Sequence, residues 1–413
     1  MERTELATIL GGARRVRDNA PYQLISESDP QKFRAAFADA VAGDADVFLG
    51  DPNWGTAEKA QVEDLLQSKI ENPKSKIRQG WLCIPTGGSG GRLQFARHDQ
   101  NTVAAAVNGF TEYFSLKRVN AVGVLPLHHV SGFMAWMRCV LTGGEYRHFS
   151  WKALEAGDLP ALPDLVDGWV LSLVPTQLDR LLRNKAGVAW LARFRFVFLG
   201  GAPAWGDLLD RAAAAGIRLS PSYGMTETAA MVTALRPEDF LAGERSSGCV
   251  LPHLKVVTMP DDTIRVMGRS VYRGYYPAWH EAETFETSDM GRIDERGGLV
   301  VLGRKDGVII SGGEKIQPAE VEAVLRDKAG LAEVVVVGLP HAEWGQVVVA
   351  AYPAGIPADL AALQQLAAQL APAKRPKHFL ALESWPLTSA GKVNRAEVAR
   401  LAGVAIRSGR NDR

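Results

Sequence analysis

The stretch at residues 86–91 concentrates four glycines and two hydroxyl side chains in six positions, and Arg92 follows it directly. Glycines let a ligand approach the backbone, and successive backbone N–H groups with hydroxyls and a cation form a site for anions. A flexible surface linker has a similar composition, so the stretch alone leaves two interpretations open. It lacks the lysine of a Walker loop and the setting of a dinucleotide-binding fingerprint. The sequence therefore indicates either another kind of phosphate-binding loop or a linker.

Three further segments with polar or glycine residues directly follow predicted strands: 125–132, 199–205 and 221–228. Buried apolar strands alternate with helices from about residue 100 to residue 222, a pattern typical of a parallel sheet with crossover helices. Ligands bind such sheets at the carboxyl ends of the strands. We therefore expect the three segments to lie near one ligand site.

The rest of the chain predicts two smaller units. Short strands with turn signals at 254–259, 261–268 and 298–304 indicate a β-rich subdomain. From about residue 305, strands and helices form a compact α+β unit, with one helix beginning near Pro318. Residues 1–80 carry mixed helical patterns. The predicted fold is α/β, with a large N-terminal domain over 1–304 and a small mobile α+β domain over 305–413.

The composition and charge of the chain exclude several classes of protein. The 413 residues are 46% apolar and 23% charged with a net charge of +1, which is ordinary for a protein with substantial cores and gives no reason to expect nucleic-acid binding. No apolar run approaches the roughly 18 residues of a membrane span, and the N-terminus lacks the features of a secretory signal. The three cysteines match neither a disulfide framework nor a zinc pattern. We expect a cytoplasmic protein, whose oligomeric state the sequence leaves open.

Eight short motifs occur in order across roughly residues 85–395: TGGSGGR, HHVSG, GGAP, YGMTET, SDMGR, GRKD, SGGEKIQPAEVE and TSAGKVNR. In this order they resemble the acyl-adenylate-forming superfamily of AMP-binding enzymes, which includes acyl-CoA synthetases. The resemblance implies a two-step reaction. A carboxylate first attacks the α-phosphorus of ATP to give acyl-AMP and pyrophosphate, and the thiol of CoA then displaces AMP. Because the first step brings two anions together, Mg²⁺, cations and backbone amides are expected around the phosphates.

The resemblance also implies which residues bind the nucleotide. The β- and γ-phosphates are expected at Thr86, Gly87, Gly88, Ser89, Gly90, Gly91 and Arg92, where most relatives end the loop with Pro-Lys. Adenine and ribose are expected at Gly200, Gly201, Ala202, Pro203, Ser222, Tyr223, Gly224, Asp289 and Arg304. Tyr223 would stack on adenine, and Asp289 would accept both ribose hydroxyls, since a carboxylate only accepts. An ordinary turn and a surface ion pair are the simpler alternatives.

Three residues resemble the catalytic positions of the family. Glu227 would bind Mg²⁺ while Thr226 contacts the α-phosphate, although a capping pair at the start of a helix would also explain the motif. Lys392 would bridge the carboxylate and the α-phosphate, although a lysine in a loop is often only solvated. Because Lys392 lies in the small domain, the resemblance implies that this domain swings in to deliver it.

The second step implies a second pose of the small domain. The expected pivot is Asp306, two residues beyond the ribose arginine, and the loop with Gly312 and Gly313 would approach the site when the thioester forms. A plain β-turn explains these two glycines equally well.

The acid is expected to bind at an acyl pocket formed by His128, His129, Ser131, Gly132 and Thr176. Adjacent side chains usually diverge and no further ligands occur at a suitable spacing, so we expect the histidine pair to form a pocket wall and not a metal site.

The segments 127–136 and 172–182, with only about 85 residues before the glycine-rich loop, most resemble the o-succinylbenzoate–CoA ligases of menaquinone and phylloquinone synthesis. That substrate is an aromatic acid with a second carboxylate, for which Arg138 is a candidate partner. On the sequence alone an exposed helix arginine is the favoured interpretation of Arg138.

Three alternatives stay open. The substrate could be another aromatic acid such as a benzoate or phenylacetate, and the acceptor could be a carrier-protein thiol. The chain could also be a non-catalytic relative that binds nucleotide or acyl-AMP. The set of Glu227, Asp289, Arg304 and Lys392 favours a catalyst.

Overall fold

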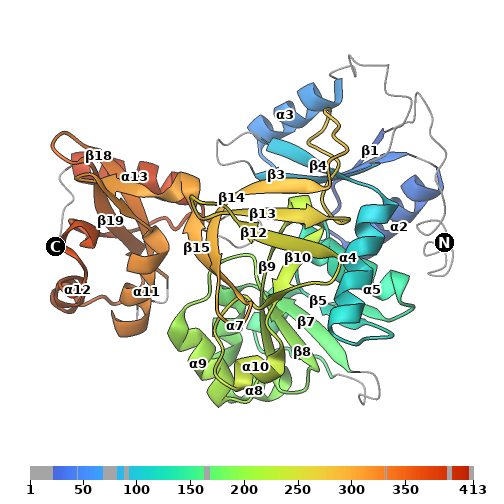
Figure 1. The fold of residues 1–413 in the computed structure, drawn as a ribbon, viewed down its shortest axis with the longest axis horizontal. Helices are drawn as coiled ribbons and strands as arrows, with labels where there is room; N and C mark the ends of the chain where they lie inside the picture. Colours follow the sequence, from blue (N-terminus) through green and yellow to red (C-terminus); the bar gives the residue numbers. More distant parts are fainter. Residues whose placement is uncertain are drawn as a thin grey trace.

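The computed structural model describes residues 22–43, 45–67, 81–87, 93–161, 168–329, 331, 333–387 and 393–408. The described strands form four sheets, of which three belong to one large body and the fourth lies beside it (Figure 1). This arrangement confirms the predicted α/β class with a β-rich part and a smaller α+β part. None of the helices in these ranges is long and apolar enough to cross a membrane.

The first sheet carries the beginning of the glycine-rich stretch. Its order is β1-β2-β3-β4, with β1 to β3 parallel and β4 antiparallel to β3. The elements are β1 (Tyr22–Ile25), α2 (Pro30–Ala42), β2 (Asp46–Leu49), α3 (Thr56–Gln67), β3 (Leu82–Gly87) and β4 (Leu93–His98). The mixed helical interpretation of residues 1–80 is confirmed for α2 and α3, but it missed strands β1 and β2. Strands β1 and β2 have four residues each, too few to show a clear alternation.

The central sheet has the order β11-β10-β9-β8-β7-β5-β6, and its strands β5 to β9 pair in parallel. Its strands are β5 (Asn120–Gly123), β6 (Tyr146–His148), β7 (Trp169–Leu173), β8 (Phe196–Leu199), β9 (Leu219–Met225), β10 (Ala230–Ala234) and β11 (Cys249–Val250). Its helices are α4 (Gln100–Tyr113), α5 (Val130–Leu141), α6 (Trp151–Glu155), α7 (Pro175–Leu182), α8 (Lys185–Leu191), α9 (Gly206–Ala214) and α10 (Pro237–Leu241). The predicted parallel sheet with crossover helices is confirmed.

Two apolar clusters pack on the central sheet. One joins it to α4, α5 and the first sheet through large side chains such as Phe37, Phe110 and Phe133. The other joins it to α7, α8 and α9 through Leu178, Leu191 and other buried residues. Because apolar burial stabilises by about 25 cal/mol per Å², covering both faces fixes the strand ends that carry the candidate site.

The third sheet is antiparallel in the order β12-β13-β14-β15. It consists of β12 (Leu254–Thr258), β13 (Thr263–Gly268), β14 (Thr284–Ile293) and β15 (Leu299–Arg304). The longest strand, β14, is absent from the sequence prediction. Most of its residues are exposed or only half-buried, so it lacks the alternation of a half-buried strand.

The fourth sheet belongs to the C-terminal part, at the left of Figure 1. It contains β16 (Ile309–Ser311), β17 (Glu314–Ile316), β18 (Val335–His341), β19 (Gly345–Pro353) and β20 (His378–Leu382). The helices α11 (Pro318–Ala329), α12 (Leu360–Ala367) and α13 (Arg395–Arg407) cover it. Helix α11 begins at Pro318 as predicted. The connection from β15 is a short 3₁₀ turn, η2 (Lys305–Gly307), and a second, η3 (Pro372–Lys374), precedes β20.

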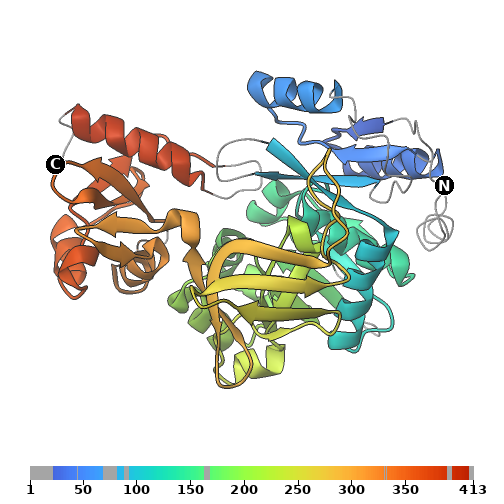
Figure 2. The ribbon, with the colours of Figure 1, turned by 45° about the horizontal axis from the view of Figure 1, so that its top comes forward.

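The C-terminal part lies to one side of the large body (Figure 2), and side chains contact each other between the two. The guanidinium of Arg326 lies 5.6 Å from the ring centroid of Trp205, and Glu333 lies 3.9 Å from Arg180. The ion pair of Arg180 with Glu333 is partly exposed, and such a pair contributes about 0–1 kcal/mol, whereas Trp205 is buried.

Candidate active site

The YGMTET motif forms the turn of a β-hairpin. Strand β9 ends at Met225, the 3₁₀ turn η1 (Thr226–Thr228) follows, and β10 returns antiparallel to β9. The capping alternative holds in part, because the hydroxyl of Thr228 accepts from the backbone N–H of Met225 at 3.3 Å, but the turn has only three residues and leads into a strand. Gly224 is required by this hairpin, since a Cβ there would lie 1.8 Å from the carbonyl oxygen of Ala230. The hairpin therefore holds Thr226 and Glu227 at the edge of the central sheet.

Glu227 connects this hairpin to the glycine-rich stretch. Its buried carboxylate accepts a 2.7 Å hydrogen bond from the hydroxyl of Tyr275, and the hydroxyl of Thr86 lies 3.4 Å from the same oxygen. Burial and the charge of Glu227 raise the pKa of Tyr275, which keeps that phenol a donor. The structure thus brings together the predicted phosphate and Mg²⁺ positions, Thr86 and Glu227. Their oxygen ligands are of the kind that Mg²⁺ prefers.

His98 supports the η1 turn through a hydrogen bond and is not among the residues predicted from the sequence. Its Nε2 lies 2.8 Å from the backbone oxygen of Thr226, and its Nδ1 lies 3.2 Å from the hydroxyl of Thr102. Burial lowers the pKa of His98 to about 4, so the ring is neutral near pH 7. Since a carbonyl only accepts, Nε2 carries the proton. No motif includes His98, which is recognisable only once β4 packs on η1.

A buried ion pair between Arg273 and Asp99 holds the segment that contains Tyr275. Arg273 donates from Nε to the carboxylate of Asp99 at 3.0 Å, and Asp99 also caps α4 by accepting from the backbone N–H of Thr102. Both charged side chains are almost inaccessible to solvent. Removing one partner of such a pair is strongly destabilising, because the other charge is then buried alone. Arg273 is close in sequence to Tyr275, so this pair also anchors the segment that contacts Glu227.

The predicted ribose residues come together from three strands. Asp289 on β14 accepts a 2.8 Å hydrogen bond from the hydroxyl of Tyr223 on β9, and Nη1 of Arg304 on β15 lies 3.4 Å from its other oxygen. Asp289 and Arg304 are also direct partners in the β14–β15 register. The arrangement leaves the guanidinium of Arg304 half-exposed and Asp289 less so. A carboxylate held in this way can accept hydrogen bonds from a diol.

The predicted adenine residues lie at the neighbouring strand end. The hydroxyl of Ser222 donates to the carbonyl of Leu199 at 3.2 Å, and a Cβ on Gly200 would lie 3.1 Å from this hydroxyl. Gly201, Ala202 and Pro203 follow in an exposed bend. Gly201 has φ +80°, a conformation that favours glycine.

Several predicted residues cannot be placed. The phosphate-loop residues Gly88, Ser89, Gly90, Gly91 and Arg92 and the predicted catalytic Lys392 lie outside the described residues. The predicted pivot Asp306 lies in η2, between the third and fourth sheets. Gly312 and Gly313 form the two-residue turn between β16 and β17, with φ values of +58° and +86°. Two positive φ angles are typical of a type I′ hairpin turn, which accounts locally for both glycines.

The predicted acyl-pocket residues lie around the start of α5 and on α7. His129 is the residue before α5, Ser131 is exposed in its first turn, and Thr176 is half-buried in the first turn of α7. Gly132 is buried in the first turn of α5. A side chain would not fit there, because a Cβ would lie 2.2 Å from the carbonyl oxygen of Pro126. Close packing against the backbone therefore explains Gly132 without a ligand.

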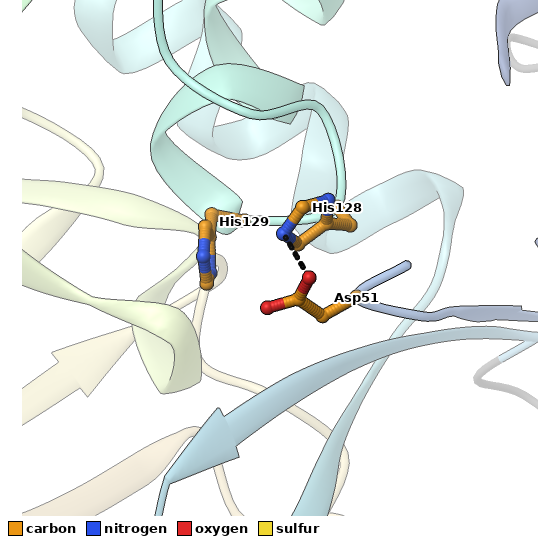
Figure 3. Close-up of side chains that lie close together, drawn as sticks. All are labelled: Asp51, His128 and His129. Carbon is orange, nitrogen blue, oxygen red and sulfur yellow. Dashed lines mark ion pairs between the residues drawn. The ribbon is translucent and has the colours of Figure 1, made fainter. Parts of the chain in front are cut away.

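The expectation that His128 and His129 diverge is wrong. Their ring centroids are 4.5 Å apart, and Nε2 of His128 lies 3.6 Å from a carboxylate oxygen of Asp51 (Figure 3). Asp51 follows β2 of the first sheet, 77 positions earlier than His128. Burial lowers the pKa of His128 although the charge of Asp51 opposes this, so the ring is neutral near pH 7. No sequence signal connects Asp51 with the histidines, because only the packing of the first sheet on α5 brings them together.

The interpretation of Arg138 as an exposed helix residue is also wrong. Arg138 is buried on α5, 5% exposed, and its guanidinium lies 4.0 Å from the ring centroid of Phe110 on α4. Its Nε is buried without a hydrogen-bond partner, and no carboxylate of the described residues pairs with Arg138. Burial lowers the pKa of Arg138 to about 10, which leaves it charged near pH 7. A buried cation without an anion is costly, so this position suits an anionic ligand.

The large mixed α/β body, the carboxylate–hydroxyl pair at the glycine-rich hairpin and the smaller α+β part together define the class of adenylate-forming enzymes. Residues 19–276 match the family of AMP-binding enzymes, and residues 320–392 match the C-terminal domain of these enzymes. The chain belongs to the AMP-binding enzyme family. The membership predicted from the eight motifs is therefore confirmed.

Curated relatives agree with this assignment. A 2-succinylbenzoate–CoA ligase of Listeria monocytogenes is 35% identical over 326 residues, which are 75% of this chain and 67% of the relative. One of Geobacillus kaustophilus is 34% identical over 340 residues, 76% and 67% of the two chains. The o-succinylbenzoate CoA synthetase of Bacillus subtilis, in complex with its acyl-adenylate intermediate, superposes with a TM-score of 0.76 over 96% of this chain and 91% of that one. At 22% identity this last likeness shows a shared fold.

Proposed function

We propose that the protein is an AMP-forming acid–thiol ligase that converts 2-succinylbenzoate to its CoA thioester in menaquinone or phylloquinone synthesis. The observation that carries the reaction class is the convergence of Thr86, Glu227 and Tyr275 beside the hydrogen-bonded set of Tyr223, Asp289 and Arg304. The relatives that are at least 34% identical carry the name of this activity. We place the reaction in the cytoplasm, as the composition suggests.

In the first step an oxygen of the substrate carboxylate forms a bond to the α-phosphorus of ATP, and the bond from that phosphorus to pyrophosphate breaks. Thr86 and the glycines after it hold the β- and γ-phosphates, and Asp289 accepts the ribose hydroxyls while Tyr223 supports the adenine side. Thr226 donates to the α-phosphate from a turn that the neutral ring of His98 holds in place. Glu227, buried and hydrogen-bonded by Tyr275, would hold Mg²⁺, which neutralises phosphate charge when bound.

Lys392 provides the remaining cation of the first step. Its ammonium bridges the attacking carboxylate and the α-phosphate, where negative charge is concentrated in the transition state. The C-terminal part, residues 305–413, delivers it by turning about Asp306 in the η2 connection. This motion would break the ion pair of Arg180 with Glu333, which contributes about 0–1 kcal/mol, and would separate Arg326 from the buried Trp205.

In the second step the thiolate sulfur of CoA forms a bond to the acyl carbon, and AMP leaves with the electron pair of the C–O bond. The C-terminal part has by then turned so that the hairpin with Gly312 and Gly313 faces the site. A site that is rebuilt between two steps is a common use of a hinge between domains.

Arg138 supports the choice of a dicarboxylic acid. One carboxylate of 2-succinylbenzoate is adenylated, and the second needs a cation in the acyl pocket. Arg138 is a buried guanidinium nine positions beyond His129, on the helix that begins at the predicted pocket. A charge-assisted hydrogen bond to a carboxylate would replace the hydration that Arg138 loses on burial.

Acid-dependent pyrophosphate release tests the proposal. The full chain is incubated with ATP, Mg²⁺ and one of 2-succinylbenzoate, benzoate or phenylacetate, and CoA is then added. We expect release with 2-succinylbenzoate and formation of its CoA thioester. Release with only benzoate or phenylacetate would favour a ligase for another aromatic acid. Release without thioester would favour a carrier-protein acceptor, and no release with any acid would favour a non-catalytic nucleotide-binding protein.

A further inference from the structure

Asp51, His128 and His129 form a compact cluster between the first sheet and α5. One ligand atom from each of them lies within 4.8 Å of the other two, and Figure 3 shows both rings and the carboxylate directed into the same space. Asp51 and His128 are buried, and His129 is partly buried. The residues of the proposed Mg²⁺ position, Thr86 and Glu227, are not members of this cluster.

The distance between His128 and Asp51 does not suit a direct hydrogen bond. At 3.6 Å the Nε2–Oδ1 separation exceeds the usual range, and this buried nitrogen has no hydrogen-bond partner among the described residues. A tetrahedral ion with bonds of about 2.1 Å to its ligands holds them about 3.4 Å apart. The separation is therefore close to that of two ligands of one ion, and the ligand atom of His129 lies within 4.8 Å of both.

The ligand types select the class of metal. Two imidazoles and one carboxylate suit zinc and similar divalent transition-metal ions, whereas Mg²⁺ prefers oxygen ligands. Three protein ligands leave a further position for water, as in many zinc sites with an open coordination position.

A neighbouring residue holds the carboxylate in place. Asn53 donates to Oδ1 of Asp51 from its backbone N–H at 2.9 Å and from its side-chain amide at 3.2 Å. Such outer hydrogen bonds orient a ligand before a metal binds. On the other side, the start of α5 fixes both histidines, because His129 is the residue that precedes its first turn.

We propose that Asp51, His128 and His129 bind one divalent transition-metal ion of the zinc class, at a site separate from that of Mg²⁺. The ion would connect the loop after β2 to the start of α5 and so tie the first sheet to the central sheet. This inference does not depend on which acid the protein activates, or on whether it activates one.

Titration of the metal-free full chain with Co²⁺, in excess Mg²⁺ and without ATP or acid, tests the proposal. We expect the visible absorption of a low-coordinate Co²⁺ centre, a stoichiometry of one per chain, and its displacement by Zn²⁺. Asp51→Asn and His129→Gln should each weaken Co²⁺ binding by about 10- to 100-fold or more. His341→Gln, a change at an exposed histidine of β18, is the matched control and should bind as the parent does.

Thermal unfolding distinguishes loss of the site from loss of the fold. Zn²⁺ should raise the Tm of the parent and of His341→Gln, and it should leave the Tm of Asp51→Asn unchanged, while all three unfold cooperatively without metal. Equal Co²⁺ affinity in the parent and in Asp51→Asn, or no Co²⁺ absorption in the parent, would overturn the proposal. Either result would leave pyrophosphate release, and hence the proposed ligase activity, unaffected.

Discussion

The predicted nucleotide side and the proposed acyl side of the candidate site differ in the hydrogen-bond partners of their charged and polar groups. On the nucleotide side, Asp289 accepts from Tyr223 and faces Arg304, and Glu227 accepts from Tyr275. On the acyl side, Arg138 is buried without a carboxylate partner in the described chain, and His128 lies 3.6 Å from Asp51 with no hydrogen bond at Nε2.

The candidate site therefore contains polar groups with partners in the protein and a buried charge without one. The groups proposed to contact the nucleotide are already held by protein hydrogen bonds, so little reorganisation would be needed when charge develops. In the proposed function, the buried charge of Arg138 remains costly until a substrate carboxylate supplies its partner, which favours a substrate with that carboxylate and disfavours one without it. The predictions below change one side at a time.

The largest effect is expected from Lys392→Ala. Loss of a cation from the transition state should reduce acid-dependent pyrophosphate release by about 10²- to 10³-fold. Thioester formation from supplied acyl-AMP and CoA should be nearly unchanged, because the lysine is used in only one pose. Lys374→Ala, which removes an ion pair with Glu320 in the same part of the chain, is the control and should affect neither step. An equal loss in both steps would contradict the two-pose proposal.

Arg138→Met should separate stability from function. Loss of the second-carboxylate contact should raise KM for 2-succinylbenzoate by about 10- to 100-fold, as for other hydrogen bonds to charged groups. The same change removes a buried unpaired charge and should raise the stability of the free protein by about 1–4 kcal/mol. Urea unfolding and initial rates measure the two effects. Arg147→Met, at an exposed ion pair with Glu145, is the control and should change neither KM nor the free energy of unfolding. An unchanged KM in Arg138→Met would show that Arg138 does not contact the substrate.

The pH dependence of stability should reflect His98. Its pKa is about 4 in the folded protein against an ordinary value of 6.5, so the unfolded chain binds more protons between these values. Stability from this residue is complete above pH 6.5 and is lost as the pH falls toward 4. Between pH 7 and pH 5.5 the folded-to-unfolded ratio should fall roughly tenfold more in the parent than in His98→Gln. Urea unfolding at both pH values measures the free energy of unfolding. An identical loss of stability in the two proteins would contradict the claim that His98 is buried as a neutral ring.

Tyr275→Phe should have the smallest effect. Loss of one hydrogen bond to Glu227 should reduce kcat/KM for ATP roughly fivefold, equivalent to about 1 kcal/mol. A larger Mg²⁺ requirement should accompany this loss, because the carboxylate is less well oriented. Tyr22→Phe, at an exposed tyrosine of β1, is the matched control. Unchanged kinetics in Tyr275→Phe would mean that Glu227 is positioned by the hairpin alone.

Much of the fold was predictable from the sequence, because the central strands and helices have the length and apolar pattern of a parallel sheet. Strands β1 and β2 could not be predicted, since a strand of four residues gives no clear hydrophobic period. Strand β14 was not, because few of its residues are buried and its pairing with β13 and β15 defines it.

The site shows the same limit. Thr86, Glu227, Tyr223, Asp289 and Arg304 lie in recognisable motifs, and the structure brings them together as two groups. The contributions of His98 and Asp51 come from contacts between residues far apart in the chain, which no local pattern records. The burial of Arg138 depends on how α4 packs against α5, and a single helix sequence does not contain that information.

A comparison of two acids tests the central claim most directly. Acid-dependent pyrophosphate release is measured for 2-succinylbenzoate and for 4-oxo-4-phenylbutanoate, which is the same molecule without the ring carboxylate. Because only the first can satisfy Arg138, the account predicts release with both and a kcat/KM for 2-succinylbenzoate higher by about 10- to 100-fold. Equal values for the two acids, or no release with either, would contradict it.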